Sequence, residues 1–231
     1  MKKLGILGGM GPAASAEFVT RLIQQTPATC DQEHIPFVLW NDPTVPDRST
    51  NLINGTDFPW KKLKEGVLSL KSVGCDHLVI PCNTAHFWYD RLAKLELPIT
   101  HIVGSVADEL NSLKIYSGTI GVIGTKATMR LGLYQDYLSK HGWTCITPST
   151  YEIDNLVQPA IDLIKSNNIE AARDLIIQAI ENLQPWNVQA IVLGCTELPL
   201  AVKDKTIKNI PIINSIDSLV TAAIKRHSLT S

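Results

Sequence analysis

Short runs of apolar residues alternate with longer stretches of helical periodicity along the chain. This alternation predicts β–α–β units with right-handed crossovers, and therefore parallel sheets. Helices are expected over residues 12–25, 59–73 and 155–183, the last with a break near Ser166. The predicted strands are Leu4–Leu7, Phe37–Trp40, His77–Ile80, Pro98–Val103, Thr119–Ile123, Cys145–Thr147, Ala190–Leu193 and Ile210–Ile213.

The two halves of this pattern can be overlaid. The segment Leu78–Cys82 matches Ile191–Cys195, and each ends in a cysteine directly after an apolar run. Sixteen residues after each cysteine a proline opens another predicted strand, at Pro98 and at Pro211. Any two β–α–β units resemble one another, but a cysteine at the same strand end with equal spacing to the next strand indicates an internal repeat.

We therefore predict an α/β fold of two pseudo-symmetric lobes, each a short parallel sheet flanked by helices. Residues 1–100 with 212–231 would form the first lobe, and residues 101–211 the second. Ligands of open parallel sheets bind beyond the carboxyl ends of the strands. If the two lobes face each other, Cys82 and Cys195 point into one cleft, which would be the active site.

Composition narrows the classes of partner. The chain has 231 residues, 45% of them hydrophobic, with 21 basic and 22 acidic residues and a net charge of -1. The core needs no disulfides, and without a basic stripe neither nucleic acid nor a membrane surface is an expected partner. No apolar run reaches the roughly 20 residues of a membrane span. The apolar start is broken by glycines, unlike a signal peptide, so we expect a cytoplasmic protein with a small-molecule ligand.

Five cysteines are present without a Cys-x-x-Cys pair, which argues against thioredoxin-like chemistry and zinc ribbons. Their default role is that of small buried apolar residues. Cys82 and Cys195 differ because both are predicted at strand-to-helix junctions, where a helix start would favour a thiolate. Inverting a carbon stereocentre needs one group to remove a proton and another to deliver one from the opposite face. A thiolate and a thiol are suited to that work.

Three segments together resemble the aspartate/glutamate racemase family. They are the opening Leu4–Pro12, the Pro81–Thr84 segment and the Leu193–Glu197 segment. The resemblance covers essentially the whole chain and is closest to the aspartate racemase branch. Glutamate racemases typically carry an aspartate in the opening loop and a histidine after the second Cys-Thr, whereas this chain has Gly-Met-Gly and Glu197.

The resemblance implies an isomerase that interconverts L- and D-aspartate, or glutamate. Cys82 and Cys195 would be the acid/base pair, with no pyridoxal phosphate, metal or nucleotide as cofactor. By analogy Cys195 would deprotonate the L-enantiomer and Cys82 the D-enantiomer. Family members are often dimers, so a homodimer is expected.

The substrate would carry two carboxylates, which require cations or oriented N–H donors. Arg48, in the loop after the second strand, and Lys165, thirty residues before Cys195, resemble the family residues near the side-chain carboxylate. Met10 of the opening glycine turn matches the family as well. Taken alone, a loop arginine and a helix lysine are usually solvated.

Around the cysteines, hydroxyl, amide and backbone N–H groups of Asn83, Thr84 and Thr196 could bind the α-carboxylate, or could simply cap helices. Glu197 could orient Thr196 or the substrate ammonium. Thr125, at the corresponding strand end of the second half, completes the substrate-binding candidates. His86, four residues after Cys82, is expected on a helix surface rather than as a group that tunes the thiol.

Other functions remain open from the residues. The glycine turn at 8–11 does not have the spacing of a dinucleotide-binding loop. Maleate isomerases, hydantoin racemases and arylmalonate decarboxylases share the two-lobe cysteine architecture, and the matches at Met10, Arg48 and Lys165 favour the racemase. A non-catalytic amino-acid-binding protein is a third reading, against which the paired cysteines count.

Overall fold

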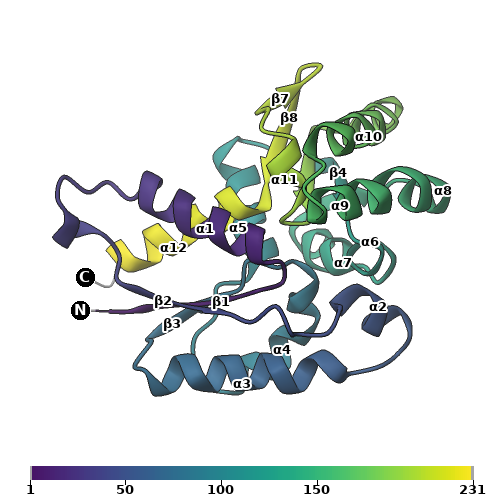
Figure 1. Cartoon of the computed structure of the whole chain (residues 1–231). Helices are drawn as coiled ribbons and strands as arrows, with labels where there is room; N and C mark the ends of the chain where they lie inside the picture. Colours follow the sequence, from purple (N-terminus) through teal and green to yellow (C-terminus); the bar gives the residue numbers. More distant parts are fainter. Residues whose placement is uncertain (1, 230–231) are drawn as a thin grey trace. The chain divides into compact units, whose positions relative to one another are not determined.

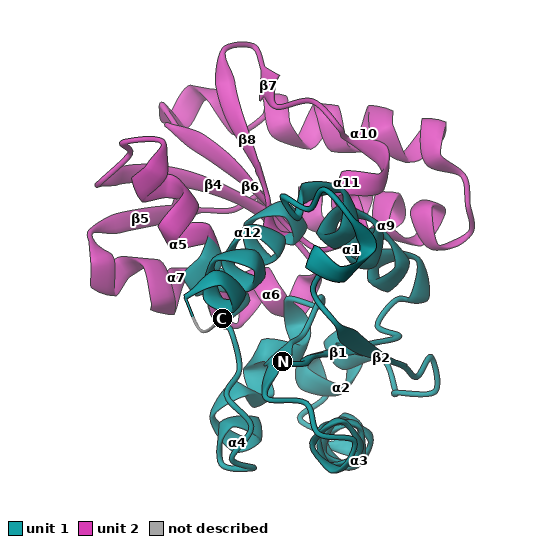
Figure 2. Cartoon of the chain, turned by 90° about the vertical axis from the view of Figure 1, so that its left-hand side faces the viewer, with its two compact units in different colours: residues 1–105, 216–231 teal, residues 106–215 magenta. Residues whose placement is uncertain are grey.

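Two parallel-stranded sheets organise the chain, one in each of two units (Figure 2). In the computed structural model, which describes residues 2–229, unit 1 comprises the chain up to Ser105 and the segment from Ile216 onward. Unit 2 is the continuous segment Val106–Ser215. The chain passes into unit 2 within α5 (Ile102–Ser112) and returns at the start of α12 (Ser215–Ser228).

Unit 1 contains a three-stranded parallel sheet with the order β2-β1-β3. All five residues of the central strand β1 are buried, as expected for a strand covered on both faces. Figure 1 shows α3 on one face of this sheet and α1 with α12 on the other. Leu63, Val67 and Leu70 recur at helical spacing on α3 and form its buried side. The bounds are β1 Leu4–Gly8, α1 Pro12–Gln25, β2 Phe37–Asn41, α2 Arg48–Ile53, α3 Phe58–Ser72, β3 His77–Val79 and α4 Tyr89–Ala93.

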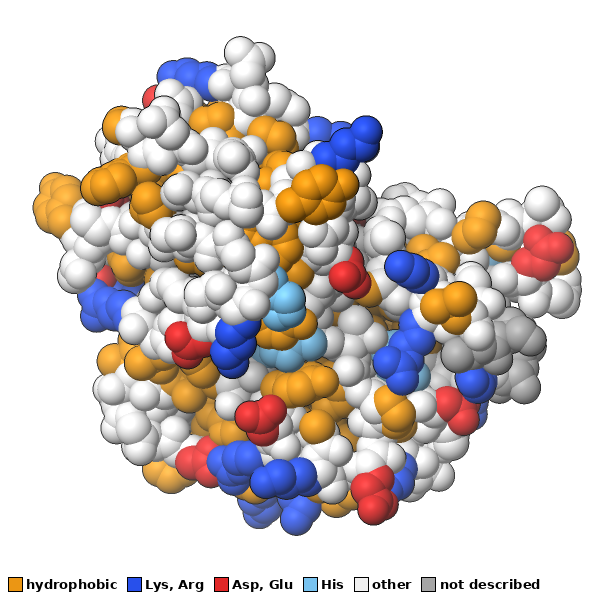
Figure 3. Space-filling view, turned by 180° about the vertical axis from the view of Figure 1, so that it is seen from behind, with side chains coloured by type: hydrophobic (Ala, Val, Ile, Leu, Met, Phe, Trp, Pro, Cys, Tyr) orange, Lys and Arg blue, Asp and Glu red, His pale blue; other side chains and the backbone are white. Residues whose placement is uncertain are grey.

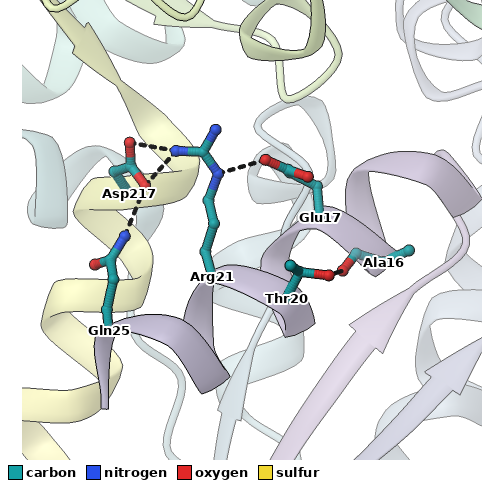
Figure 4. Close-up of polar contacts among 6 residues, drawn as sticks. All are labelled: Ala16, Glu17, Thr20, Arg21, Gln25 and Asp217. Carbon is teal, nitrogen blue, oxygen red and sulfur yellow. Dashed lines mark hydrogen bonds and ion pairs between the residues drawn. The ribbon is translucent and has the colours of Figure 1, made fainter. Parts of the chain in front are cut away.

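An ion-pair network joins α12 to α1 within unit 1 (Figure 4). Arg21 of α1 donates through Nη1 to both carboxylate oxygens of Asp217 at 2.6 Å, and through Nε to Glu17 at 2.6 Å. Gln25 Nε2 donates to Asp217 as well, at 3.0 Å. Asp217 lies in the first turn of α12, where a carboxylate also favours the helix dipole. The network therefore fixes the returning helix on the first one.

Unit 2 contains a five-stranded sheet with the order β5-β4-β6-β8-β7. Its first three strands repeat the second-first-third order of unit 1, and all pairs are parallel except β7 with β8. The strand β6 is buried throughout. The strands are β4 Gly118–Gly124, β5 Trp143–Ile146, β6 Ala190–Gly194, β7 Thr206–Ile207 and β8 Ile210–Asn214.

Helices pack on both faces of the unit 2 sheet. Ile161, Ile176 and Ile180 of α9 and α10 share one core cluster with Leu193 of β6. On the other face, Tyr134 of α7 is fully buried, and its ring lies close to Gly194. The helices are α6 Lys126–Arg130, α7 Leu133–Leu138, α8 Thr150–Glu152, α9 Gln158–Lys165, α10 Ile169–Glu181 and α11 Leu198–Ala201, with a π-helical stretch at Ile153–Val157 before α9. Short 3-10 helices lie at Asp31–Glu33, Thr84–Trp88, Ser139–His141 and Gln184–Trp186.

The expected strand Pro98–Val103 is wrong beyond its start. Leu78 N–H donates to Pro98 O and Thr100 N–H donates to Leu78 O, which makes a single β-bridge at Ile99. The backbone N–H groups of Ile102 and Val103 donate to the rings of His86 and His101, and the chain turns into α5. Histidine capping of the helix thus ends the strand.

Two smaller differences concern unit 2. The strand expected at Cys145–Thr147 begins earlier, at Trp143. The hairpin of β7 and β8 was not predicted. Its turn residues Lys208 and Asn209 both have positive φ, 46° and 65°, as a two-residue type I′ turn requires. A Lys-Asn pair lacks the glycine by which such turns are usually found.

The surface of the described residues carries mixed charge. On the face shown in Figure 3, acidic and basic side chains are interspersed among apolar ones. Within residues 2–229, every helix is too short or too polar to cross a membrane.

We predict that Arg21→Ala lowers the free energy of unfolding by about 1 kcal/mol, because Asp217 loses the charged partner that contacts both of its carboxylate oxygens at a partly exposed site. Urea denaturation measures the change. Glu17→Ala is the control, since it removes the pair within α1 and leaves Arg21 on Asp217; it should cost about 0.3–0.5 kcal/mol. Equal losses in the two variants would contradict a specific role of the α1–α12 pair.

Candidate active site

In unit 1, the loops after β1 and β2 approach each other at the carboxyl edge of the sheet. Gly9 has a φ of 91°, and a Cβ there would lie 2.3 Å from the backbone of Asp42. Only glycine permits this approach. Gly9 N–H donates to Ser15 Oγ at 2.9 Å, which fixes the turn on α1. The Met10 side chain is packed in the core of unit 1, so its backbone is the part that a substrate could contact.

Cys82 lies at the same edge, three residues beyond β3. Its side chain is 4% exposed, and the neighbouring Asn83 and Thr84 are buried too. The helix expected after it begins as the 3-10 helix Thr84–Trp88 and continues as α4. The three residues predicted for the site from this segment are therefore together, at the end of the strand where a parallel sheet binds ligands.

His86 is buried beneath this segment, so its expected place on a helix surface is wrong. Ile102 N–H donates to Nε2 at 3.1 Å. Nδ1 must then carry the hydrogen, and it donates to the carbonyl oxygen of Cys82 at 2.9 Å. Burial lowers the pKa of His86 to about 4, which keeps the ring neutral. One ring thus links the backbone of Cys82 to the first residue of α5.

A second histidine caps the same helix. His101 Nδ1 accepts hydrogen bonds from Val103 N–H at 3.2 Å and Gly104 N–H at 3.4 Å. Burial, followed by the neighbouring His86, lowers the pKa of His101 to about 3. The ring of His101 lies edge-on to those of His86 and Tyr89. His101 was not among the sequence-predicted residues, because it lies inside the segment Pro98–Val103, for which a strand was expected.

Arg48 is the first residue of α2, whose N-cap is Asp47. Its side chain is half-buried, and Nη1 donates to the carbonyl oxygens of Val45 at 3.1 Å and Pro46 at 3.3 Å. The Nε atom is buried without a hydrogen-bond partner among the described residues. A buried, unsatisfied charged donor is costly, and an anionic ligand would satisfy it.

In unit 2, Thr125 and Cys195 lie side by side. Gly124 of β4 is paired with Gly194 of β6, and each candidate follows its glycine directly. A Cβ at Gly124 would lie 2.8 Å from Gly194 O, so the two strand ends are closer than a larger residue allows. Thr125 caps α6 by accepting from Thr128 N–H at 3.2 Å. Thr125, expected as a substrate-binding candidate at a strand end, therefore lies beside the second cysteine.

Cys195 forms a buried pair with Glu197. The thiol donates to Glu197 Oε2, with 2.9 Å between sulfur and oxygen. The two side chains are 4% and 5% exposed. Burial, reinforced by the adjacent carboxylate, raises the pKa of Cys195 well above its usual value. A backbone hydrogen bond from Glu197 acts to lower this pKa, as expected at a helix start, but burial and the Glu197 carboxylate outweigh it. The helix that follows, α11, has only four residues.

Other polar groups of unit 2 surround this pair. Thr196 Oγ1 also donates to Glu197 Oε2, at 3.5 Å. Lys165 is the exposed last residue of α9, and its charge acts to lower the pKa of Cys195, more weakly than Glu197 raises it. Burial raises the pKa of Tyr134 far above its usual range, so that phenol is neutral. Tyr134 was not among the sequence-predicted residues, since an aromatic on an amphipathic helix gives no signal of a site.

The remaining cysteines are Cys30, Cys75 and Cys145. Cys30 is exposed. Burial raises the pKa of Cys75, and it raises the pKa of Cys145 to about 12. Within residues 2–229 there is no group of three or more His, Cys, Asp or Glu side chains placed to hold a metal ion.

Comparison with known proteins gives the class. A family model described as "Asp/Glu/Hydantoin racemase" matches residues 7–223. The chain belongs to this racemase family, which places it among the isomerases. The resemblance noted from the three sequence segments is thereby confirmed.

Individual relatives agree. A protein of Bacillus subtilis (strain 168) named "Broad specificity amino-acid racemase RacX" is 27% identical over 229 residues, or 97% of each chain. The structure of Picrophilus torridus aspartate racemase matches with a TM-score of 0.83 and 29% identity, covering 99% of this chain and 95% of the other. Glutamate racemase of Francisella tularensis, solved with D-glutamate, has a TM-score of 0.73 at 14% identity, over 99% of this chain and 82% of that one, and is similar in fold alone. The predicted two-lobe α/β fold class is confirmed.

We predict that acid destabilises unit 1 through the buried His86 and the half-buried His77 and His101. Burial lowers the pKa of His77 to about 4, beside the values of about 4 for His86 and about 3 for His101. Below a pH of about 6.5 these histidines become protonated in the unfolded chain but stay neutral in the folded protein. The free energy of unfolding should therefore fall from pH 6.5 toward 4, by up to about 1.4 kcal/mol per pH unit for each histidine.

Urea denaturation between pH 7.5 and 4.5 measures this slope. In His101→Asn an amide oxygen can still cap α5, but the titrating ring is gone, so the slope should decrease by about one proton. His141→Asn, at an exposed histidine of unit 2, is the matched control and should leave the slope unchanged. A slope that His101→Asn does not reduce would refute the assignment.

Proposed function

We propose that the chain racemises aspartate without a cofactor, with Cys82 and Cys195 as the two acid/base groups. The observation that carries the proposal is that both units place a buried cysteine beyond the third strand of the same second-first-third strand order. Such an arrangement supplies two equivalent groups, which a reaction on opposite faces of one carbon requires. Family membership adds that the reaction is of the racemase type.

The proton transfers balance with two sulfurs. The thiolate of one cysteine removes the α-proton, and the electron pair of the broken C–H bond stays on the carbon. The thiol of the other cysteine then delivers its proton to the opposite face. The enzyme ends with the two protonation states exchanged, so the next molecule must react in the reverse sense or the thiols must exchange protons with water.

Arg48 supports a substrate with a second carboxylate. Its buried Nε lacks a partner among the described residues, and a carboxylate accepting from this atom would satisfy it. Lys165 of unit 2 adds a positive charge near enough to Cys195 to influence the pKa of that thiol. Picrophilus torridus aspartate racemase, at 29% identity, is consistent with this choice.

Binding of the α-carboxylate is proposed for the strand ends themselves. Backbone N–H groups near Met10, together with polar groups of Asn83, Thr84, Thr125 and Thr196, form these ends. RacX is named for broad specificity, so the same groups could serve other amino acids. A substrate range dominated by aspartate would reflect Arg48, whereas a broad range would mean that the shared ammonium and α-carboxylate suffice.

We expect Cys82→Ala and Cys195→Ala each to abolish aspartate racemisation, since either variant lacks one of the two proton-transfer groups. Chiral chromatography measures turnover, and proton NMR in deuterated water follows loss of the α-proton. Cys30→Ala, at an exposed cysteine of unit 1, is the control and should retain wild-type turnover. Near-normal racemisation in either active-site variant would end the two-cysteine mechanism. Turnover of maleate instead of aspartate would point to a nucleophilic cysteine.

Arg48→Ala and Lys165→Ala should each lower kcat/KM for aspartate at least tenfold, about 1.4 kcal/mol of transition-state stabilisation. The loss arises because a desolvated carboxylate would be left without its paired charge. Lys203→Ala, at an exposed lysine of unit 2, is the matched control. The same variants should matter little for L-alanine. If they turn over aspartate normally, neither residue reads the side-chain carboxylate.

A further inference from the structure

The pair formed by Cys195 and Glu197 bears on the protonation state of Cys195 before substrate binds. The sulfur and Oε2 are 2.9 Å apart, both side chains are almost fully buried, and the thiol is the donor. Thr196 donates to the same oxygen. The carboxylate is thus oriented toward the sulfur, one of the proposed reacting atoms.

Two negative charges at this separation would repel strongly in a site from which water is excluded. The pair therefore holds one proton over most of the neutral pH range. The hydrogen bond in which the thiol donates to Oε2 leaves that proton on sulfur.

The other titratable groups around the sulfur do not offset this effect. Lys165 is exposed at the end of α9, where water screens it. Tyr134 of α7 and Cys145 of β5 are neutral, because burial raises the pKa of each, that of Cys145 to about 12. Glu197 is the dominant neighbouring charge among those acting on Cys195.

We propose that Glu197 is the proton-holding partner of Cys195, keeping it a thiol in the resting enzyme, so that Cys195 enters the first turnover as the proton donor. This inference rests on the proposed two-cysteine racemisation. The Cys195 S–H bond breaks as the proton passes to the substrate carbon, while Cys82 gains the proton taken from the opposite face. The new Cys195 thiolate beside Glu197 is then a strong base, which either removes a proton from the next substrate or regains one from water.

The effect cannot favour one enantiomer at equilibrium. L- and D-aspartate have equal free energies, so kcat/KM must stay equal for both in every variant. Glu197 instead sets the pH at which the last thiol is lost, which is the alkaline limb of the activity profile. With the face assignment of the family resemblance, the resting enzyme accepts D-aspartate first.

The test is a titration of Cys195 in the full chain. Thiolate absorbance near 240 nm is followed with pH, and the curve of the matching Cys195→Ala protein is subtracted. In the wild type, Cys195 should titrate above Cys30, which is obtained by the same subtraction with Cys30→Ala. In Glu197→Gln, with similar shape but no charge, the Cys195 midpoint should fall by about one pH unit or more. Glu181→Gln, at another glutamate of unit 2, should leave it in place.

Activity gives the second readout. In Glu197→Gln the alkaline limb of kcat/KM should move to lower pH by the same amount for L- and D-aspartate. A merely structural role would lower activity without moving the thiol titration. Wild-type Cys195 titrating at or below Cys30 would overturn the inference even if Glu197→Gln failed to fold, and so would an unchanged midpoint in Glu197→Gln. A shifted midpoint in a chain without racemase activity would instead reject the proposed function and leave the pairing standing.

Discussion

Parallel pairing of strands is the constraint on which the candidate site depends. The carboxyl ends of all strands in a parallel sheet lie at the same edge, so the loops that follow them come together even when they are distant in sequence. In unit 2 this is visible residue by residue: the register that pairs Gly124 with Gly194 leaves Thr125 and Cys195 as neighbours. In unit 1 the turn at Gly9 meets the backbone of Asp42 at the corresponding edge. The chemistry therefore follows from strand register more than from any local motif.

Burial then decides the charge state of the titratable side chains near the two cysteines. The rings of His86 and His101 stay neutral, and their nitrogens form hydrogen bonds with the backbone of Cys82 and of the start of α5. Such groups position the site without adding charge. Cys195 differs because its neighbour, Glu197, is a buried carboxylate that accepts a hydrogen bond from the thiol. The two topologically equivalent cysteines thus have chemically different surroundings.

How far the sequence predicts this structure varies with the kind of interaction. Apolar runs such as Ala190–Gly194 predict buried strands well, since burial on both faces leaves a continuous hydrophobic signal. The pattern failed at Pro98–Val103, where capping of α5 by the rings of His86 and His101 redirects the backbone. It also failed for His86, because a histidine on a short helix reads as exposed unless both of its hydrogen-bond partners are known. The contact of Cys195 with Glu197 depends on rotamers in a tight turn, which spacing alone does not specify.

The path of the chain between the units bears on how the protein is made. Unit 2 is one uninterrupted segment, whereas unit 1 needs both the beginning of the chain and α12. During synthesis, unit 2 is therefore fully emerged before the first unit has all of its parts. The three-stranded sheet must wait with one face lacking α12 until Asp217 can reach Arg21. Until α12 is synthesised, unit 1 keeps apolar surface exposed. Chaperone binding or aggregation would compete with folding during this period.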